Sequence, residues 1–323
     1  MSGAEALPAW AALFPGQGSQ RVGMGRDLVD AWPEAEAVFA AADDALGEPL
    51  SRLCFEGPEE RLRLTRNTQP ALLTVGVACW RVLEGRVPLP AAAAGHSLGE
   101  YTALVAAGVL AFEDAVRAVR LRGEAMQEAV PVGEGAMAAV IGLEPDAVAA
   151  LCAETAREGE VLVPANINAP DQIVVAGHAA AVERLGPAAR GRGAKRVVPL
   201  AVSAPFHCPL MAPAAERLAR FFDGIEFREP RFPVVANVDA RPVTTGAQAR
   251  DRLVRQVVAP VRWVDVLRTL GSELRVTEAL ELGPGRVLAG LARRAGAPFA
   301  VRPAGSAESM REAVEALAGR EEG

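Results

Sequence analysis

The first part of the chain alternates short apolar runs with longer stretches in which apolar residues recur at helical spacing. The apolar runs over residues 10–14 and 91–94 each stop at a glycine-rich turn, which is typical of buried strands. Helical spacing predicts helices over residues 32–46, 68–83, 100–107 and 112–128. Strand, glycine turn and helix in succession predict an α/β scaffold built on a parallel sheet.

The pattern changes between about residues 135 and 202. It predicts, in order, a strand, a helix, two strands, a helix and a strand, over residues 136–143, 145–155, 161–167, 173–176, 180–190 and 196–202. This β-α-β-β-α-β order is the split arrangement of a ferredoxin-like unit. We therefore expect a small, self-contained domain in the middle of the chain.

After this segment the pattern again alternates predicted helices with short predicted strands. The pattern predicts helices over residues 212–222, 250–258 and 264–270, and strands over residues 234–237 and 276–282. A length of 323 residues is typical of about two domains. We expect a discontinuous large domain, residues 1–132 and 204–323, interrupted by the small domain, residues 133–203.

The composition narrows the class of protein. Half of the residues are hydrophobic (50%) and 23% are charged, which supplies a sizeable core and excludes a disordered chain or a coiled coil. The net charge of -6 argues against broad binding to nucleic acid or to an anionic membrane surface. The longest apolar run, about residues 102–112, is much shorter than the roughly 20 residues that cross a bilayer. We expect neither a nucleic-acid nor a membrane partner.

The cysteines point to a reducing compartment. Cys54, Cys79, Cys152 and Cys208 lie far apart without a C-x-x-C pair, and no secretory signal pattern precedes them. We expect reduced thiols in a cytoplasmic protein. No pair of histidine, cysteine or acidic residues has the spacing of metal ligands, so we expect no metal site.

A candidate nucleophile lies at the second predicted strand-to-helix turn. Gly95-His96-Ser97-Leu98-Gly99 matches G-x-S-x-G, the nucleophile elbow, in which a tight turn holds the serine exposed. The alternative is that Ser97 only caps a helix. A strand before the motif and a helix after it favour the nucleophile, and the helix N-terminus would aim free N–H groups at charge developing beside Ser97.

The base for this serine is one of three histidines. His96 adjoins the serine, so its side chain should point away from the hydroxyl and pack or hydrogen-bond elsewhere. His178 follows a strand of the small domain, where a surface or turn position is expected. Elimination leaves His207, in a segment bracketed by prolines, although a lone histidine is more often structural.

No acidic residue stands out as the third member of a triad. The acids between Ser97 and His207 fall mostly on helix faces or in the inserted domain. We therefore expect a dyad in which a backbone carbonyl or a neutral side chain holds the imidazole. Cys208 is a poor alternative nucleophile, because adjacent residues rarely present both side chains to one reaction centre.

Seven sequence motifs, the nucleophile elbow among them, agree in order with one family. They are Phe14-Pro15-Gly16-Gln17-Gly18-Ser19-Gln20, Thr68-Gln69-Pro70-Ala71-Leu72, Gly95-His96-Ser97-Leu98-Gly99-Glu100-Tyr101, Arg122-Gly123 with Met126-Gln127, Gly135-Ala136-Met137-Ala138-Ala139, Asn166-Ile167-Asn168, and Glu281-Leu282-Gly283-Pro284-Gly285. From about Trp10 to Leu291 the chain resembles the malonyl-CoA:acyl carrier protein transacylases of fatty-acid synthesis and the acyltransferase domains of polyketide synthases. The resemblance implies an α/β-hydrolase-like large subdomain with an inserted ferredoxin-like small subdomain.

The resemblance also implies a ping-pong reaction through a malonyl-serine. Ser97, deprotonated by His207, would attack the thioester of malonyl-CoA, and the phosphopantetheine thiol of an acyl carrier protein would then take the malonyl group. By the same resemblance, backbone N–H groups of Gln17 and Leu98 form the oxyanion hole, and the main-chain carbonyl of Gln256 orients the histidine. Malonyl-CoA is a substrate, so no cofactor is expected.

Two side chains would set substrate specificity under this resemblance. Arg122 would grip the malonyl carboxylate through two charge-assisted hydrogen bonds; taken alone it reads as a solvated helix arginine. Phe206 would crowd an α-methyl substituent and so disfavour methylmalonyl. Stand-alone fatty-acid enzymes often carry a small residue at the position of Phe206, which leaves the choice between fatty-acid and polyketide pathways open.

An acidic carrier protein needs a local basic patch on this acidic chain. The run Arg190, Arg192, Lys195 and Arg196 supplies one, with a solvated helix end as the equal alternative. Rival functions are a proofreading acyl hydrolase, which should lack the carboxylate-binding arginine, transfer of another carboxylated acyl unit, and a non-catalytic carrier-binding protein. We expect a monomer.

Overall fold

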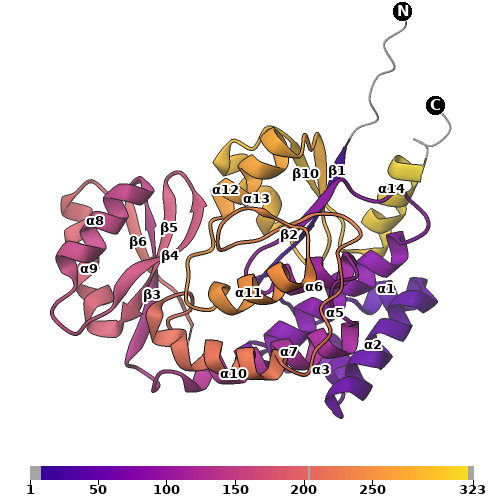
Figure 1. Ribbon diagram of the computed structural model, residues 1–323, viewed down its shortest axis with the longest axis horizontal. Coiled ribbons are helices and arrows are strands. Elements are labelled where there is room, and N and C mark those ends of the chain that lie inside the picture. The colour runs from indigo at the N-terminus through magenta and orange to yellow at the C-terminus, as the bar shows by residue number, and fades with distance from the viewer. Residues whose placement is uncertain (1–8, 203, 319–323) are drawn as a thin grey trace, which may run out of the picture.

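The computed structural model describes residues 9–202 and 204–318, and they form two β-sheets surrounded by helices (Figure 1). The larger sheet has six strands in the order β10-β9-β1-β2-β7-β8. Neighbouring strands run parallel except for β8, which is antiparallel to β7. The strands are β1 (Trp10–Phe14), β2 (Ala92–Gly95), β7 (Val234–Val235), β8 (Pro242–Val243), β9 (Glu278–Glu281) and β10 (Ala300–Pro303).

Helices cover both faces of this sheet, and β1 shows why. Its side chains alternate, so Ala12 and Phe14 enter one core cluster while Ala11 and Leu13 enter the other. The first cluster packs against α2, α5, α6, α7 and α10, and the second against α12 and α13. Helices of this body are α1 (Arg26–Ala31), α2 (Pro33–Leu46), α3 (Leu50–Glu56), α4 (Glu59–Leu62), α5 (Thr65–Leu83), α6 (Gly99–Ala106), α7 (Phe112–Glu128), η1 (Pro209–Met211), α10 (Ala212–Phe222), α11 (Gly246–Gln256), α12 (Trp263–Arg268), η2 (Thr269–Glu273), α13 (Val287–Ala295) and α14 (Ala307–Ala318).

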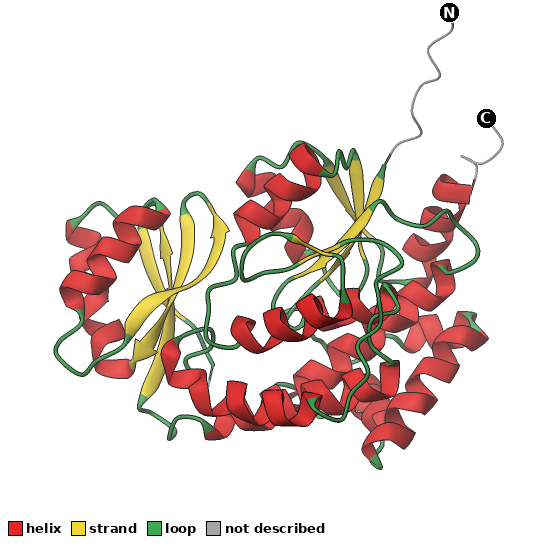
Figure 2. Ribbon diagram, in the orientation of Figure 1, coloured by secondary structure: helices red, strands yellow, loops and turns green. Residues whose placement is uncertain are grey.

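The smaller sheet is the left-hand part of Figure 2 and has four antiparallel strands in the order β4-β5-β3-β6. Its two helices pack on one face and bury a cluster that includes Val140, Leu151 and Leu185. The opposite face packs against Cys208 and Phe206. Its elements are β3 (Gly135–Ile141), α8 (Pro145–Thr155), β4 (Leu162–Ala169), β5 (Gln172–His178), α9 (Ala179–Gly191) and β6 (Arg196–Pro199).

Strand β4 ties the smaller sheet to the larger body. The backbone N–H of Ile167 donates to the carbonyl of Val261 at 2.9 Å, and the N–H of Val261 donates to the carbonyl of Ala165 at 2.9 Å. Asp171, in the turn after β4, forms an ion pair with Arg294 of α13 at 2.8 Å. The small sheet is therefore held beside the larger one along its β4 edge.

The predicted mixed α/β class is confirmed, and several predicted elements differ only in their ends. The strand predicted over residues 234–237 stops at Val235, because the N–H of Ala236 donates to Arg241 within a turn and the N–H of Asn237 donates to a side chain. The helix predicted from residue 250 begins at Gly246, where the Thr245 hydroxyl caps it by accepting from the N–H of Gln248. The strand predicted over residues 196–202 ends at Pro199.

The predicted domain bounds remain a prediction. The four strands and two helices of the smaller sheet all lie within residues 133–203, but the last of these, Ser203, is outside the described residues, as are residues 1–8 and 319–323 of the predicted large domain. Within the described part of the chain, none of the helices combines the length and the apolar character needed to cross a membrane.

Candidate active site

Ser97 lies in a strained turn between β2 and α6. Its φ of 53° is in the left-handed region that residues with a side chain rarely adopt. The turn is tight because a Cβ on Gly95 would lie 1.9 Å from the carbonyl carbon of Gly99, and a Cβ on Gly99 would lie 2.1 Å from the carbonyl oxygen of Phe14. Both glycines of the motif are therefore required by close backbone packing.

His207 faces Ser97 from the segment that follows the smaller sheet. Its Nε2 lies 2.7 Å from the Oγ of Ser97, and its Nδ1 lies 2.9 Å from the backbone carbonyl oxygen of Gln256. A carbonyl oxygen only accepts, so Nδ1 carries the hydrogen and Nε2 presents its lone pair to the serine hydroxyl. This is the arrangement that a general base requires.

The environment keeps this imidazole neutral. Burial, followed by the charge of the Arg122 guanidinium, lowers the pKa of His207 to about 3. Both effects disfavour the imidazolium form. At neutral pH the histidine is therefore unprotonated at Nε2 and able to accept the proton of Ser97.

Arg122 reaches the serine from α7. Its side chain is 2% exposed, and Nη2 donates to the Ser97 Oγ at 3.1 Å. The remaining bonds go to neutral amide oxygens, from Nη2 to the Gln256 Oε1 at 3.0 Å and from Nη1 to the Gln69 Oε1 at 2.7 Å. No carboxylate of the described residues forms an ion pair with it. The carboxylate of Glu100 acts on Arg122 through its charge but is not in contact with it. A buried cation beside a nucleophile, with no carboxylate in direct contact, favours an anionic substrate.

A cavity of about 120 Å³ opens beside these side chains. It lies between the two bodies, because Met137, Asn166 and Leu200 come from the smaller sheet and its exit. The predicted residues Gln17, Leu98 and Phe206 also line it. Its full lining is Gln17, Gln69, His96, Ser97, Leu98, Arg122, Met126, Met137, Asn166, Leu200, Val202, Phe206 and His207.

The backbone amides predicted for the oxyanion hole are available. Within residues 9–202 and 204–318, no oxygen accepts a hydrogen bond from the N–H of Gln17 or of Leu98. The Gln17 side chain donates instead to the Thr65 hydroxyl at 3.3 Å, which ties its loop to α5. Leu98 is the N-cap of α6, so its N–H belongs to the positive end of that helix.

The other two histidines hold structural positions. His96 lines the cavity, but its Nε2 bonds to the Asn168 Oδ1 at 2.8 Å and its ring packs against Trp263. His178 accepts from the N–H of Val161 at 2.8 Å. Neither faces the hydroxyl of Ser97.

Cys208 is not placed as a nucleophile. Its thiol donates to the carbonyl of Pro205 at 3.0 Å, and burial raises its pKa to about 11. The four cysteines are all free and buried. No group of three histidine, cysteine or acidic residues in the described segments could hold a metal ion.

The predicted docking residues lie away from the cavity. Arg190 lies in the last turn of α9, Lys195 immediately precedes β6, and Arg196 begins β6. These three residues and Arg192 are all exposed. Arg192 forms an ion pair with Glu154 at 2.5 Å. None of the four lines the cavity, although β6 leads directly to Leu200, which does.

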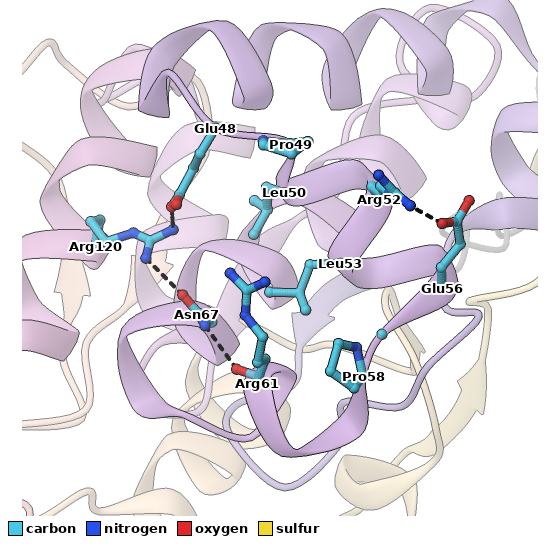
Figure 3. Close-up of a pocket in the computed structure, with 11 residues that line it drawn as sticks. Glu48, Pro49, Leu50, Arg52, Leu53, Glu56, Pro58, Arg61, Asn67 and Arg120 are labelled. Atoms are coloured by element: carbon cyan, nitrogen blue, oxygen red, sulfur yellow. Dashed lines mark hydrogen bonds and ion pairs between the residues drawn. The ribbon is translucent and has the colours of Figure 1, made fainter.

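A second pocket, of about 530 Å³, lies among α3, α4, α5 and α7 (Figure 3). Its charges largely neutralise one another: Arg120 bonds to Glu48 and to Asn67, and Arg52 pairs with Glu56 at 2.9 Å. It shares no lining residue with the cavity beside Ser97.

Sequence reasoning assigned no role to three buried residues around the site, Gln69, Glu100 and Asn237. Gln69 lies within a motif already singled out, just before the apolar part of its helix. Glu100 lies within a motif already singled out, and Asn237 follows a strand at the carboxyl edge of the sheet. Their partners are far away in the chain, which sequence spacing does not reveal.

Comparisons with known proteins give matches over nearly the whole chain. Residues 12–317 match the acyl transferase domain family. The malonyl CoA-acyl carrier protein transacylase of Escherichia coli K12 is 51% identical over 289 residues, covering 89% of this chain and 93% of that protein. The transacylase of the same name from Bacillus subtilis is 44% identical over 307 residues, covering 95% and 96%.

Solved structures agree as well. The malonyl CoA-acyl carrier protein transacylase of Coxiella burnetii superposes with a TM-score of 0.93 at 44% identity, covering 97% of this chain and 98% of that one. A malonyl-transacylase in complex with a type II polyketide synthase acyl-carrier protein superposes with a TM-score of 0.92 at 48% identity, covering 95% and 99%. The chain belongs to the acyl transferase domain family and, within it, to the malonyl CoA-acyl carrier protein transacylases.

Proposed function

We propose that this protein transfers a malonyl group from malonyl-CoA to the phosphopantetheine thiol of an acyl carrier protein. One observation carries the choice of acyl group: the buried guanidinium of Arg122 donates to the hydroxyl of Ser97, its other hydrogen bonds go to neutral amides, and no carboxylate of the described residues forms an ion pair with it. A malonyl carboxylate would supply the missing anion next to the nucleophile. Acetyl would leave that cation uncompensated.

The first half-reaction acylates the enzyme. His207 Nε2 accepts the proton of the Ser97 hydroxyl while Oγ attacks the thioester carbonyl of malonyl-CoA. The N–H groups of Gln17 and Leu98 hold the oxyanion of the tetrahedral intermediate. The intermediate collapses to the malonyl-serine ester, and the C–S bond breaks as His207 returns its proton to the departing thiolate of CoA.

The second half-reaction reverses these roles. His207 accepts the proton of the carrier's phosphopantetheine thiol, whose sulfur attacks the ester carbonyl of malonyl-Ser97. The intermediate collapses to malonyl-carrier, and the proton returns to the Ser97 Oγ. The Nδ1–H of His207 keeps its bond to the Gln256 carbonyl in both halves, which holds the ring in the tautomer that both proton transfers need.

Phe206 selects against branched acyl groups in this proposal. It lines the cavity immediately before His207 in the chain. A phenyl ring in the wall of the cavity narrows the space for an α-methyl substituent. Methylmalonyl should therefore be a poorer substrate than malonyl.

We also propose which kind of subdomain each of the two bodies forms. Residues 1–132 and 204–323 form an α/β-hydrolase-like subdomain, supported by the parallel strands and by the serine on a strand-to-helix elbow. Residues 133–203 form a ferredoxin-like subdomain, supported by the β-α-β-β-α-β order and the antiparallel pairing.

We propose that the carrier protein docks on the exposed run Arg190, Arg192, Lys195 and Arg196. Support comes from their positive charge and from β6, which runs from this patch to the cavity wall. We propose that the protein acts as a monomer and needs no cofactor, because malonyl-CoA is a substrate. Four free, buried thiols fit the cytoplasmic setting expected from the sequence.

Transfer to a purified carrier protein tests this function against the hydrolase alternative. The protein is mixed with malonyl-CoA, with and without phosphopantetheinylated carrier, and the masses of carrier and free malonate are followed. A transferase produces malonyl-carrier, which disappears with Ser97→Ala. Rapid release of malonate at equal rates with and without carrier would instead establish the hydrolase.

A further inference from the structure

Glu100 is a buried carboxylate that the proposed reaction does not use. It lies in the first turn of α6, three residues after the nucleophile, and is 1% exposed. Its Oε2 accepts from the Gln256 Nε2 at 2.8 Å and from the backbone N–H of Asn237 at 2.9 Å. Burying a carboxylate is costly, so its place beside the site requires a reason.

Gln256 connects this carboxylate to the substrate-binding arginine. The Nε2 of its side chain donates both to Glu100 and to the backbone carbonyl of Ser97, the latter at 3.0 Å. The Oε1 of the same amide accepts from the Nη2 of Arg122 at 3.0 Å. Glu100, Gln256 and Arg122 thus form one chain of hydrogen bonds that ends at the Ser97 hydroxyl.

Glu100 helps to set the direction of this chain of hydrogen bonds, together with the Ser97 carbonyl. An ionised carboxylate only accepts, whereas an amide can present either its oxygen or its NH₂ group. The carboxylate of Glu100 and the carbonyl of Ser97 accept on one side, and the guanidinium of Arg122 donates on the other. The NH₂ group of Gln256 therefore faces Glu100, and its oxygen faces Arg122. If the Gln256 amide rotated by about 180°, its NH₂ group would face the N–H groups of Arg122. The guanidinium would then lose the amide oxygen as an acceptor.

A second branch leads from Glu100 to the elbow itself. The Asn237 backbone donates to Glu100, while its side chain accepts from the N–H of Ser97 at 2.7 Å and donates to the carbonyl of Gly95 at 2.8 Å. The carboxylate of Glu100 therefore accepts hydrogen bonds both from Asn237, which holds the elbow, and from Gln256, which bonds to Arg122.

We propose that Glu100 is a positioning residue for malonyl selectivity, which it controls by fixing the orientation of the Gln256 amide and, through it, the guanidinium of Arg122. This inference rests on the proposed function, because it assigns Arg122 to the malonyl carboxylate. Glu100 does not touch the substrate. The backbone carbonyl that holds His207 is part of α11, so turning the Gln256 amide alters Arg122 more than it alters the base.

Glu281 provides a matched control for loss of a buried carboxylate. It is 0% exposed, and its two oxygens accept from the backbone N–H groups of Leu288 and Ala289 at the start of α13. These bonds cap that helix, and Glu281 does not line the cavity beside Ser97. Replacing it should cost stability without changing which acyl group is preferred.

The test compares Glu100→Gln with Glu281→Gln by measuring kcat/KM for acylation by malonyl-CoA and by acetyl-CoA. In Glu100→Gln the neutral amide at position 100 can donate to Gln256. The ratio of kcat/KM for malonyl-CoA to kcat/KM for acetyl-CoA should therefore fall at least about tenfold, mainly because kcat/KM for malonyl-CoA falls. In Glu281→Gln the ratio should stay within about twofold while the melting temperature falls.

A double-mutant cycle assigns the effect to the path through Gln256. Gln256→Met removes the amide and should lower the ratio by a similar factor, and adding Glu100→Gln to it should change the ratio no further. If Glu100→Gln does not fold, Gln256→Met is measured alone. The inference requires the malonyl-over-acetyl ratio to fall in that variant too.

Three results would overturn the inference: an unchanged ratio in folded Glu100→Gln, an unchanged ratio in Gln256→Met, or additive losses in the double variant. Failure of the proposed function is recognised separately, because the wild-type protein would then not be acylated by malonyl-CoA at all.

Discussion

The charge beside Ser97 is the most informative feature at the scale of single residues. Arg122 is fully enclosed, yet its hydrogen bonds go to a hydroxyl and to two neutral amides. Buried arginines normally pair with carboxylates, because an unpaired cation in a low-dielectric site costs several kcal/mol. We infer that this positive charge is kept for an anionic substrate. Burial, and after it the charge of Arg122, lowers the pKa of His207 and so keeps the imidazole neutral.

Removing this charge should reverse the substrate preference. In Arg122→Ala, kcat/KM for malonyl-CoA should fall about hundredfold, since a bidentate charge-assisted contact is lost, while acetyl loading should improve. Arg122→Lys is the matched control, because it keeps the charge but not the bidentate geometry. Its kcat/KM for malonyl-CoA should lie between those of the wild type and Arg122→Ala. Acylation kinetics with both thioesters provide the measurement, and an unchanged malonyl rate in Arg122→Ala would contradict the assignment.

The pH dependence should follow Glu100 and not His207. Burial raises the pKa of Glu100 to about 7, opposed by its hydrogen bonds and by Arg122 and reinforced by Asp239, whereas the pKa of His207 is lowered to about 3. Below about pH 7 Glu100 gains a proton and stops being a pure acceptor, so kcat/KM for malonyl-CoA should decline on the acid side.

The control for this pH profile is Glu100→Gln, which has no group to titrate at that position. Its kcat/KM should be lower than that of the wild type but flat from pH 8 down to about 5.5, because His207 stays neutral throughout. An acid limb of the same midpoint in both proteins would show that another group is responsible.

At the scale of elements, the contact between β1 and the β2–α6 elbow positions the nucleophile. The N–H of His96 donates to the Phe14 carbonyl at 3.0 Å, and Gly99 lies against the same carbonyl. The elbow is thereby pressed onto the end of β1, next to the loop that carries Gln17. The close approach brings the serine and the Gln17 loop to one edge of the sheet.

A single methyl group should disturb this approach. Gly99→Ala would place a Cβ 2.1 Å from the Phe14 carbonyl oxygen, which is backbone and cannot turn aside, so unfolding free energy should fall by at least about 2 kcal/mol. Gly290→Ala is the matched control inside α13, where a Cβ meets nothing within 4 Å and should raise stability by about 0.5–1 kcal/mol. Denaturant titration measures both, and equal effects would refute the account of the elbow.

Local sequence signals explain which elements could be predicted. The helices predicted over residues 112–128, 145–155 and 212–222 have the bounds observed, and the latter two carry a proline in the first turn that marks their start. Short strands were overextended, as at residues 234–237, because a turn diverts the chain after two ladder residues. The hydrogen bonds of Glu100 join residues 137 and 156 positions apart, so no local pattern could predict them.

At the scale of the whole molecule, the cavity exists only where the two bodies meet. Ser97, Arg122 and His207 come from the larger body, and Met137, Asn166 and Leu200 from the smaller sheet and its exit. Pairing of β4 with Val261 and the Asp171–Arg294 ion pair hold this arrangement. A carrier protein that delivers its thiol to Ser97 must therefore approach the line between the bodies.

The exposed basic run should influence this approach through charge. In Lys195→Glu/Arg196→Glu the KM for an acidic carrier should rise about tenfold at low salt, and the difference should shrink at high salt because exposed charges are screened. Acylation by malonyl-CoA without carrier should stay within about twofold. Arg52→Glu/Arg63→Glu changes the net charge equally at an exposed place on α3 and near α4 and should leave the carrier KM unchanged. Equal KM values in all three proteins would place docking elsewhere.

The central claim is that Ser97 carries the malonyl group between the two substrates, and intact-protein mass spectrometry tests it most directly. After brief mixing with malonyl-CoA in the absence of carrier, the wild-type protein should show a single malonyl adduct that is absent in Ser97→Ala and is discharged when carrier is added. A malonyl adduct that persists in Ser97→Ala, or transfer to carrier without any adduct in the wild type, would contradict the claim.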